Sequence, residues 1–387
     1  MTRLLVAARP KEVSTASFDA FVMRHTALVR RFAENYDVSV LLMEPEGAPD
    51  AGPLDLPDGC AAETVSVPRL DDGRMARLWS MRAVVHEPAL APWERAAVEA
   101  VERFDPHVIV TLGPWLTTEF RALHGTRPSV HFFEEDLSQM SELAPQSAQA
   151  RALRTMTTAA LGRRAWQPRV TIAISPPELL RARRASRRAE AVLVPLTLDP
   201  DVWPVEATMS TGDAVVVIGV LREARNAEGL AAVLGRVRDR GLGGRLRFRL
   251  VTGSGIHPVL ESFLGLGWVD AGPERVSLAS EYRNARCSLV PAFRATGMKT
   301  TILQSWAGGC PVVTTPVCAA GVGERPAHAL VVGEDPDGLV DHLLAMENDA
   351  RRRQLAAAGR ERLRVDFDRG AQDARVLALL ERVVRGR

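Results

Sequence analysis

The sequence predicts an α/β protein of two doubly wound domains in tandem, and three observations support this fold class. Its 387 residues exceed one ordinary domain, so two domains of about 190 residues each are expected. Short apolar, β-branched runs alternate with helical segments, which is typical of a parallel sheet covered on both faces. A polar, proline-bearing segment at 195–213 interrupts this pattern, which then begins again. Two such sheets facing each other across a hinge would form a cleft at the carboxyl ends of their strands.

The N-terminal half contains apolar runs that predict strands, separated by stretches of helical periodicity. The predicted strands are 3–7, 37–42, 107–112, 129–133, 169–174 and 191–194. The predicted helices are 24–35, 91–104 and 146–165. Another helix start is marked at 175–178, where Ser-Pro-Pro-Glu combines an N-cap serine, prolines in the first turn and a glutamate three residues on.

The C-terminal half repeats the alternation of strands and helices. Its predicted strands are 214–218, 246–252, 287–291, 311–315 and 329–332. Its predicted helices are 228–240, 281–285 and 300–307, followed by a mostly helical tail at 336–385. We therefore expect a first domain at 1–197 and a second at 198–370. The last helix, 371–387, is expected to cross back to the first domain.

Composition excludes several function classes. Apolar residues make up 46% and charged residues 25%, the balance of a soluble globular protein. The net charge of +2 is too small for a general nucleic-acid or membrane binder. No run of 18 apolar residues and no secretory leader are recognised, and the four cysteines lack CxxC spacing. We expect a cytoplasmic protein whose thiols are reduced and mostly buried.

The segment at 296–313 is the strongest candidate for chemistry. A strand ends at Pro291, a loop of small residues follows, and a helix begins near Thr300, so backbone N–H groups and the positive helix end point at any anion in the cleft. Gly297 allows close approach of the backbone. Lys299 would add a charge beside a diphosphate, and Gln304 would reach a ribose hydroxyl. The competing interpretation is ordinary loop and helix packing.

From about residue 214 to the C-terminus the chain resembles the donor domain of GT-B glycosyltransferases, particularly retaining enzymes of family 4. Residues 295–313 resemble the family pattern G-x-G-x-K-x-K-x-L-E-A-x-A-x-G-x-P-V-V. Pieces that agree in order and spacing are 216–219, 251–255, 266–269, 282–285 and 314–321. The N-terminal half matches more loosely, through 3–7, 128–136 and 194–204.

The resemblance implies two Rossmann-like domains, an acceptor-binding N-terminal one and a donor-binding C-terminal one. It also implies a hexosyltransferase-like enzyme that uses a nucleotide-diphosphate sugar, retains the anomeric configuration and needs no metal or other cofactor. Polysaccharide building and decoration of a secondary metabolite both fit. The alternatives are a catalytically degenerate partner or activator subunit, and a nucleotide-sugar-modifying enzyme of the same fold, such as an epimerase.

Carried over residue by residue, the resemblance is incomplete. The family's ribose-binding glutamate falls on Gln304, and Val220 stands where many members have an arginine. The next basic position falls on Arg225, with Arg222 one turn away. Arginine forks bind phosphate oxygens bidentately, so these two are expected to clamp the diphosphate, unless they only mark a solvated helix entrance. The expected donor-binding set is Gly219, Arg222, Gly253, Gly297, Met298, Thr300 and Gln304. The expected catalytic residues are Lys299, Arg225 and Glu134.

The acceptor side is predicted from loops of the N-terminal half. Glu134 and Glu135 follow the strand at 129–133, where Glu134 would orient an acceptor hydroxyl or bind an amino sugar. Many family members place a histidine near this position, but His131 lies inside the strand. Ser14 lies on the acceptor-facing loop, and Trp115 would stack on an acceptor ring. The competing interpretations are an acidic turn that caps the next helix and core packing of Trp115.

Two further patterns receive structural interpretations. Asp-x-Asp pairs, which hold a metal in another glycosyltransferase class, occur at 199–201, 335–337 and 366–368, none placed like that metal site. A run of arginines at 181–188 reads as a solvated helix face, with weak attraction to anionic membrane headgroups as the alternative.

Overall fold

The structure is a computed structural model, and it describes fourteen stretches of the chain. These are residues 1–8, 20–45, 56–67, 92–112, 121–124, 126–133, 168–185, 189–198, 203–206, 208–253, 255–273, 277–294, 297–323 and 329–386. The chain divides into two compact units. Unit 1 comprises Met1–Leu196 and Gly370–Arg387, and unit 2 comprises Thr197–Arg369. The predicted helix at 146–165 lies outside the described residues.

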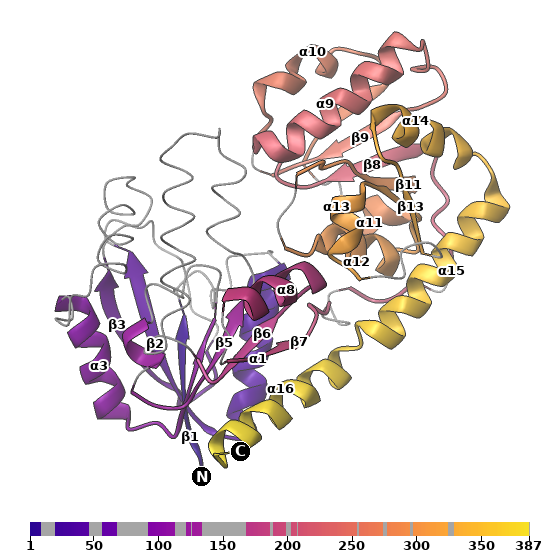
Figure 1. The fold of residues 1–387 in the computed structure, drawn as a ribbon. Helices are drawn as coiled ribbons and strands as arrows, with labels where there is room; N and C mark the ends of the chain where they lie inside the picture. The colour runs from indigo at the N-terminus through magenta and orange to yellow at the C-terminus, as the bar shows by residue number, and fades with distance from the viewer. Residues whose placement is uncertain are drawn as a thin grey trace. The chain divides into compact units, whose positions relative to one another are not determined.

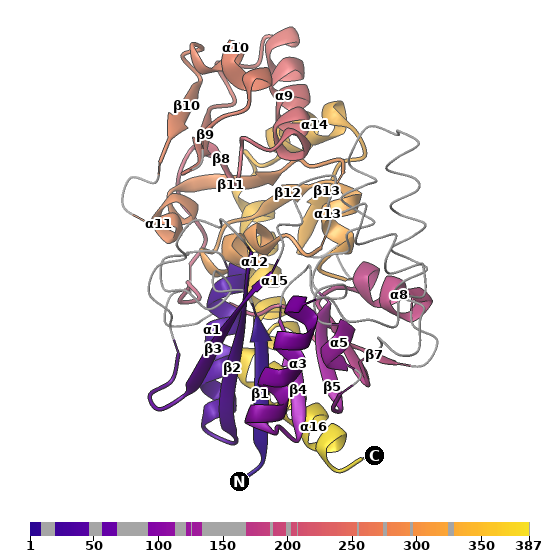
Figure 2. The same cartoon turned by 90° about the vertical axis from the view of Figure 1, so that its left-hand side faces the viewer.

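Unit 1 contains a seven-stranded parallel sheet of order β3-β2-β1-β4-β5-β6-β7 (Figures 1 and 2). Its strands are β1 (Arg3–Ala8), β2 (Asp37–Pro45), β3 (Ala61–Val67), β4 (Val108–Thr111), β5 (Ser129–Phe133), β6 (Val170–Ala173) and β7 (Glu190–Leu193). The order reverses between β1 and β4, so the predicted doubly wound fold is confirmed for this unit.

The edge strand β3 was missed by the sequence patterns. Among the residues of β3 whose side chains are described, Val65 alone is buried. A strand that buries so little has no apolar run to reveal it, and its place is decided by pairing with β2.

Helices cover both faces of the unit 1 sheet. They are α1 (Ala20–Ala33), α3 (Pro92–Phe104), α5 (Arg121–His124), α8 (Pro176–Ala185) and α16 (Arg369–Val384). Side chains of α1 and α16 share one apolar cluster with alternate residues of β1, β4 and β5, whereas α3 packs in a second cluster with the other set. One bond of the capping box predicted at 175–178 is present. Ser175 Oγ accepts from the Glu178 N–H at 3.5 Å, while the buried Glu178 carboxylate lies 3.4 Å from Arg181.

The last helix belongs to the N-terminal unit. Val376, Leu380 and Val383 of α16 are buried in the cluster that contains Leu28 and Phe32 of α1. Arg382 forms an ion pair with Glu190 at 2.7 Å, and Arg375 donates to the Leu193 carbonyl at 2.9 Å. Apolar positions spaced by three and four residues therefore attach the end of the chain to unit 1.

Unit 2 contains a six-stranded parallel sheet of order β10-β9-β8-β11-β12-β13. Its strands are β8 (Ala214–Ile218), β9 (Phe248–Val251), β10 (Val269–Gly272), β11 (Ala285–Val290), β12 (Val312–Thr314) and β13 (Leu330–Val332). The order again reverses, between β8 and β11, and confirms a second doubly wound sheet. The short edge strand β10, Val-Asp-Ala-Gly, has only its first residue buried and was not predicted.

The helices of unit 2 are α9 (Ala224–Asp239), η3 (Pro258–Leu260), α10 (Glu261–Leu264), α11 (Leu278–Arg283), α12 (Thr300–Ala307), α13 (Pro316–Ala320), α14 (Pro336–Ala345) and α15 (Asp349–Asp366). Helix α9 begins at Ala224, four residues before its predicted start at 228. Its N-cap, Glu223, makes no side-chain capping bond, so the sequence carries no cap signal there. Helix α12 has its predicted bounds.

Trp306 anchors α12 to α15. The ring is fully buried, its Nε1–H donates to the Ala329 carbonyl at 3.1 Å, and the Arg362 guanidinium lies 5.4 Å from its centroid. A Cβ at Gly359 of α15 would lie 2.3 Å from the ring, so the two helices approach closely here. The C-terminal end of α12 is thus held by the packing of the Trp306 ring against α15.

We expect Trp306→Phe to destabilise unit 2 by about 2 kcal/mol, because it removes aromatic volume and leaves the buried Ala329 carbonyl without its donor. Amide hydrogen exchange of α12 and α15, followed by mass spectrometry, measures the change. Protection in unit 1 is the internal reference. Unchanged protection of α12 would contradict the anchoring role.

No helix in the described stretches has both the length and the apolar character needed to cross a membrane.

Candidate active site

The centre of the unit 2 sheet has the geometry of a ligand site. Strands β8 and β11 lie side by side, and the chain winds outward from them in opposite directions, through β9 and β10 on one side and β12 and β13 on the other. Open α/β sheets bind ligands at such a switch point, outside the carboxyl ends of the strands. The segments that leave this edge begin at Gly219 after β8 and at Pro291 after β11.

Two of the predicted glycines have backbone conformations that other residues avoid. Gly219 has φ +155° and Gly297 has φ +63°. A Cβ at Gly219 would meet nothing within 4 Å, so its requirement is conformational. Both glycines lie in the connections that leave β8 and β11, where the chain must turn sharply at the switch point.

Helix α12 begins directly behind this turn. Lys299 is its N-cap residue, with φ −83° and ψ 98°, and its side chain makes no capping hydrogen bond. The first turn contains no acidic residue, so no carboxylate of that turn offsets the positive end of the helix dipole. Met298 is 3% exposed and ties the loop to the core. This arrangement can stabilise an anion at the carboxyl edge of β11.

The connection after β12 contacts the segment that follows β11 at the same edge of the sheet. The sequence did not predict this contact. Thr315 caps α13, and its hydroxyl donates to the Ala292 carbonyl at 2.6 Å. The Cys318 thiol also lies 3.4 Å from that carbonyl. A buried threonine before proline is a recognisable N-cap in sequence, but its partner 23 residues away is decided only by the fold.

Gln304 lies on the second turn of α12 and is 6% exposed. Its ribose-binding role stays a prediction, and only a small part of its side chain is accessible. Thr300, the first residue of the helix, is half-buried beside Lys299.

The predicted arginine clamp lies on the connection after β8. Arg222 is exposed, and Arg225 is half-buried, with Nε 2.7 Å from a Glu223 carboxylate oxygen. Val220, which stands where the resemblance expects arginine, is 39% exposed. Gly253, two residues beyond β9, is exposed on the adjacent exit. The topology therefore brings the described donor-site residues to one sheet edge, whereas their contact with a ligand stays a prediction.

The predicted acceptor-side residues Ser14, Trp115, Glu134 and Glu135 lie outside the described residues. His131 lies within β5 as expected, and it is buried. Its Nδ1 and the Thr111 hydroxyl share a hydrogen bond of 2.8 Å, and its ring meets that of His124 edge to face with centroids 5.9 Å apart. Burial holds the pKa of His124 at about 4 and, together with the charge of His124, that of His131 at about 3.

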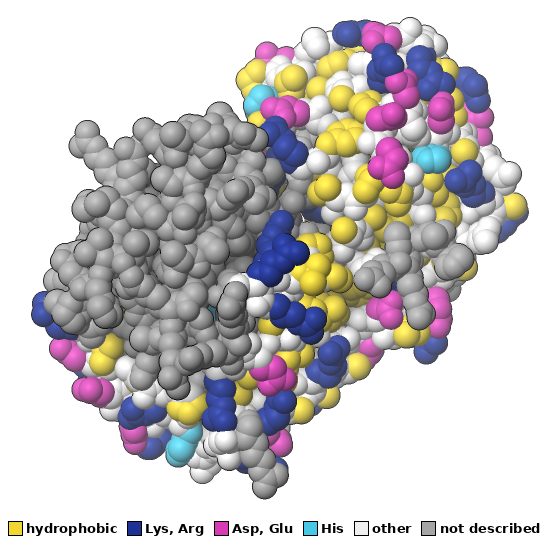
Figure 3. Space-filling model, in the orientation of Figure 1, with side chains coloured by type: hydrophobic (Ala, Val, Ile, Leu, Met, Phe, Trp, Pro, Cys, Tyr) yellow, Lys and Arg dark blue, Asp and Glu magenta, His cyan; other side chains and the backbone are white. Residues whose placement is uncertain are grey.

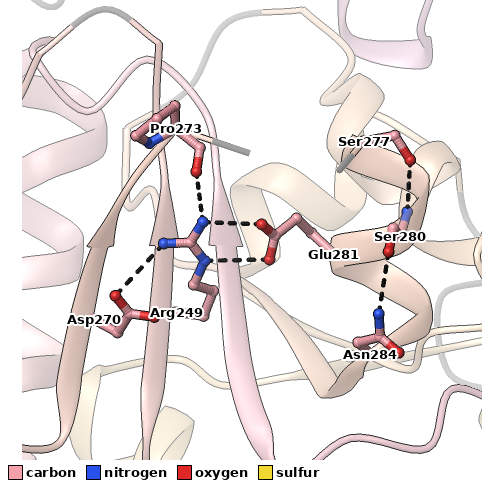
Figure 4. A network of polar contacts seen from close by, with 7 residues as sticks. All are labelled: Arg249, Asp270, Pro273, Ser277, Ser280, Glu281 and Asn284. Atoms are coloured by element: carbon pink, nitrogen blue, oxygen red, sulfur yellow. Dashed lines mark hydrogen bonds and ion pairs between the residues drawn. The ribbon is translucent and has the colours of Figure 1, made fainter. Parts of the chain in front are cut away.

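A second buried polar group lies in unit 2 and was not singled out in the sequence. Arg249 of β9 is 7% exposed and makes a two-pronged ion pair with Glu281 of α11, which is 8% exposed (Figure 4). The alternation of Arg247 and Arg249 with apolar residues resembles an exposed strand face. The helices on that face bury Arg249.

The described Asp-x-Asp carboxylates have structural partners. Asp335 caps α14 by accepting from the Gly338 N–H at 2.7 Å, Asp337 pairs with Arg236, and Asp366 pairs with Arg362 at 2.9 Å. Within the described stretches, no three His, Cys, Asp or Glu side chains group as a metal site. On the face of unit 2 in Figure 3, acidic and basic side chains are interspersed.

Part of the unit 2 sequence is similar to a known protein family. Residues 212–349 match the family model described as glycosyl transferases group 1. No curated protein matches the sequence.

Solved structures match over the whole chain. Sucrose-phosphate synthase from Thermosynechococcus elongatus has a TM-score of 0.74 at 16% identity and covers 100% of both chains. Anabaena HepE, in complex with UDP and glucose, has a TM-score of 0.67 at 12% identity over 98% of this chain and 100% of its own.

A mutant of S. aureus TarM, in complex with fondaparinux, alpha-GlcNAc-glycerol and UDP, has a TM-score of 0.67 at 8% identity over 99% of this chain and 100% of its own. Such identities establish the fold, and the fold is that of GT-B glycosyltransferases. Residues 212–349 of unit 2 therefore resemble glycosyl transferases group 1, and the chain as a whole has the GT-B fold.

Proposed function

We propose that this protein transfers a sugar from a nucleotide-diphosphate donor to an acceptor hydroxyl or amine, with retention of the anomeric configuration. The observation that carries the proposal is the start of α12 at the β8/β11 switch point. There the positive-φ Gly297, the N-cap Lys299 and a helix N-terminus without acidic residues occur together. These features suit a diphosphate, whose charge grows as it leaves.

In the proposed reaction, the bond between the anomeric carbon and the diphosphate oxygen breaks while the acceptor oxygen bonds to that carbon from the same face. The acceptor proton passes to the departing phosphate oxygen. Lys299 and the α12 N–H groups stabilise the developing negative charge, and Arg225 assists from the β8 side. The charge is supplied by the chain itself, so we propose that the reaction needs no metal.

Uridine is the first nucleoside to test, because HepE and TarM, which share this fold, were each solved with UDP. The acceptor class follows the sequence expectation, either a growing polysaccharide or a secondary metabolite. Glu134 remains the third proposed catalytic residue, and Glu135, Trp115 and Ser14 remain the proposed acceptor-side residues. All four cysteines are free, and Cys287, Cys310 and Cys318 are buried. Free thiols support the proposal that the protein acts in the reducing cytoplasm.

The first experiment is a thermal-shift screen with UDP, GDP, ADP and dTDP. A ligand present at 100 times its Kd stabilises the native state by about 2.7 kcal/mol, so the correct base should raise Tm by several degrees. The same nucleotide should shift the Tm of Lys299→Ala much less. If none of the four raises the Tm of the wild type, the donor-site proposal is wrong.

A catalytically degenerate partner subunit is the second candidate, and two observations favour it. Gln304 is uncharged and almost buried, and an exposed valine, Val220, occupies the position of the expected arginine. Nucleotide binding without transfer to any acceptor, together with a stable complex with another enzyme, would support this candidate. Where transfer is observed, the anomeric configuration of the product, read by proton NMR, tests retention.

A further inference from the structure

Arg249 is a buried cation to which the proposed reaction assigns no role. It lies within β9, between Phe248 and Leu250, which face the main apolar cluster of unit 2. Its side chain therefore points to the opposite face of the sheet, toward α11. A charge in such a place is costly unless it is paired and hydrogen-bonded, so its partners indicate what it holds together.

The guanidinium joins three elements (Figure 4). Nε and Nη2 donate to the two Glu281 carboxylate oxygens at 3.2 and 2.9 Å, and Nη2 also donates to the Pro273 carbonyl at 2.5 Å. Nη1 lies 3.6 Å from Asp270, its register partner in β10. The bond to Glu281 raises the pKa of Arg249. One side chain thus connects β9, the end of β10 and α11.

The contact of Arg249 with Pro273 lies at the carboxyl edge of the sheet. Pro273 is the first residue after β10, and the Thr252 N–H at the end of β9 donates to the Gly272 carbonyl at 3.1 Å. Ser277, which caps α11, accepts from the Ser280 N–H at 3.1 Å. Arg249 therefore determines where the backbone exits of β9 and β10 lie relative to α11.

The order of the strands indicates that the backbone exits of β9 and β10 take part in ligand binding. A diphosphate at the start of α12 lies outside β8 and β11, so the nucleoside must extend either over β9 and β10 or over β12 and β13. The exit of β12 is taken by α13, which Thr315 ties to Ala292. The exit of β9 presents Gly253, which is exposed and has nothing within 4 Å of a Cβ position. Among the residues that the structure describes, the open direction is over β9 and β10.

We infer that Arg249, held by Glu281, is a positioning residue for the nucleoside end of the donor site. Arg249 fixes the position of the backbone that follows β9 and β10, and the base of a nucleoside diphosphate packs against this backbone. Arg249 itself does not touch the ligand. The inference rests on the proposed function, and it adds the residue that supports base recognition.

The test uses the double variant Arg249→Met, Glu281→Leu in the full chain. Either single change would take the two-pronged partner from a buried charge, whereas apolar replacement of both partners is often neutral for stability. The double variant loses the tether to Pro273. Calorimetric titration with UDP, GDP, ADP and dTDP gives the Kd of the tightest nucleotide, and titration with inorganic pyrophosphate gives that of a ligand without a base.

We expect the Kd of the tightest nucleotide to rise at least about tenfold in the double variant, with the Kd of pyrophosphate within about twofold of wild type. The matched control is Val237→Ala. It perturbs the buried core at the last turn of α9, and that end of the helix lies away from the carboxyl edge because α9 runs back along the sheet. Both Kd values should keep their wild-type ratio in this control.

Three outcomes would overturn the inference. If the double variant binds the nucleotide with the wild-type Kd, Arg249 has no positioning role, and the proposed function is unaffected. Equal weakening of nucleotide and pyrophosphate assigns Arg249 to general stability. A wild-type protein that binds neither probe rejects the proposed function, and the inference with it.

Discussion

Replacing Lys299 by alanine is expected to lower the rate of sugar transfer at least about tenfold while the fold of unit 2 stays intact. Lys299 is the N-cap residue of α12, and in the proposed site its charge adds to that of the helix end. Its side chain does not cap the helix, so truncation leaves the helix start as it is. The loss should appear mainly in kcat, because the charge on the diphosphate is greatest as the sugar departs.

Lys299→Arg is the matched control, because it keeps the positive charge and changes its geometry. It should retain more activity than the alanine variant. Steady-state rates with the nucleotide sugar identified by the thermal-shift screen, together with circular dichroism of each variant, separate catalysis from folding. Near-normal turnover of Lys299→Ala would overturn the assignment of the site.

Unit 1 is expected to lose stability steeply as the pH falls below about 6.5, because His124 and His131 are buried as neutral rings. The pKa of both is 6.5 when unfolded, and burial lowers it to about 4 and about 3 in the folded state. The unfolded chain therefore binds more protons than the native one throughout that window, and unfolding becomes easier with each proton gained. The stabilisation is fully present above pH 6.5. At pH 5 each histidine contributes a loss of about 2 kcal/mol, or about 4 kcal/mol for the pair.

Hydrogen exchange of the β4 and β5 amides at pH 7.5 and at pH 5, corrected for the intrinsic exchange rate, measures this loss. His131→Gln is the matched control, since an amide can share the hydrogen bond with Thr111 and does not titrate. It should remove about half of the pH dependence. Equal protection of β4 and β5 at the two pH values would show that the histidines do not govern the acid stability of unit 1.

The central strands and the doubly wound class could be predicted from sequence, because a strand buried on both faces must be an unbroken apolar run. The runs at 214–218 and 129–133 coincide with β8 and β5. The edge strands β3 and β10 could not, since one face or one side of each meets solvent and leaves little apolar signal. Their positions follow from pairing with β2 and β9.

The candidate site divides in the same way. Gly297, Lys299 and the start of α12 are local features, because a backbone turn and a helix N-terminus are encoded within a few residues. Arg249, Glu281 and Thr315 act through partners more than twenty residues distant, and no local pattern reveals such partners.

By itself, the sequence determined that this chain has two α/β units and that a helix starting at Thr300 follows a turn suited to an anion. Periodicity and turn chemistry act over a few residues, so these features needed no knowledge of the rest of the chain. Only the tertiary structure decided which strand exits share one edge, that Arg249 is buried, and that His124 of α5 and His131 of β5 are withdrawn from water. Those properties depend on which distant segments exclude solvent from a side chain, and that exclusion exists only once the sheets and helices have packed.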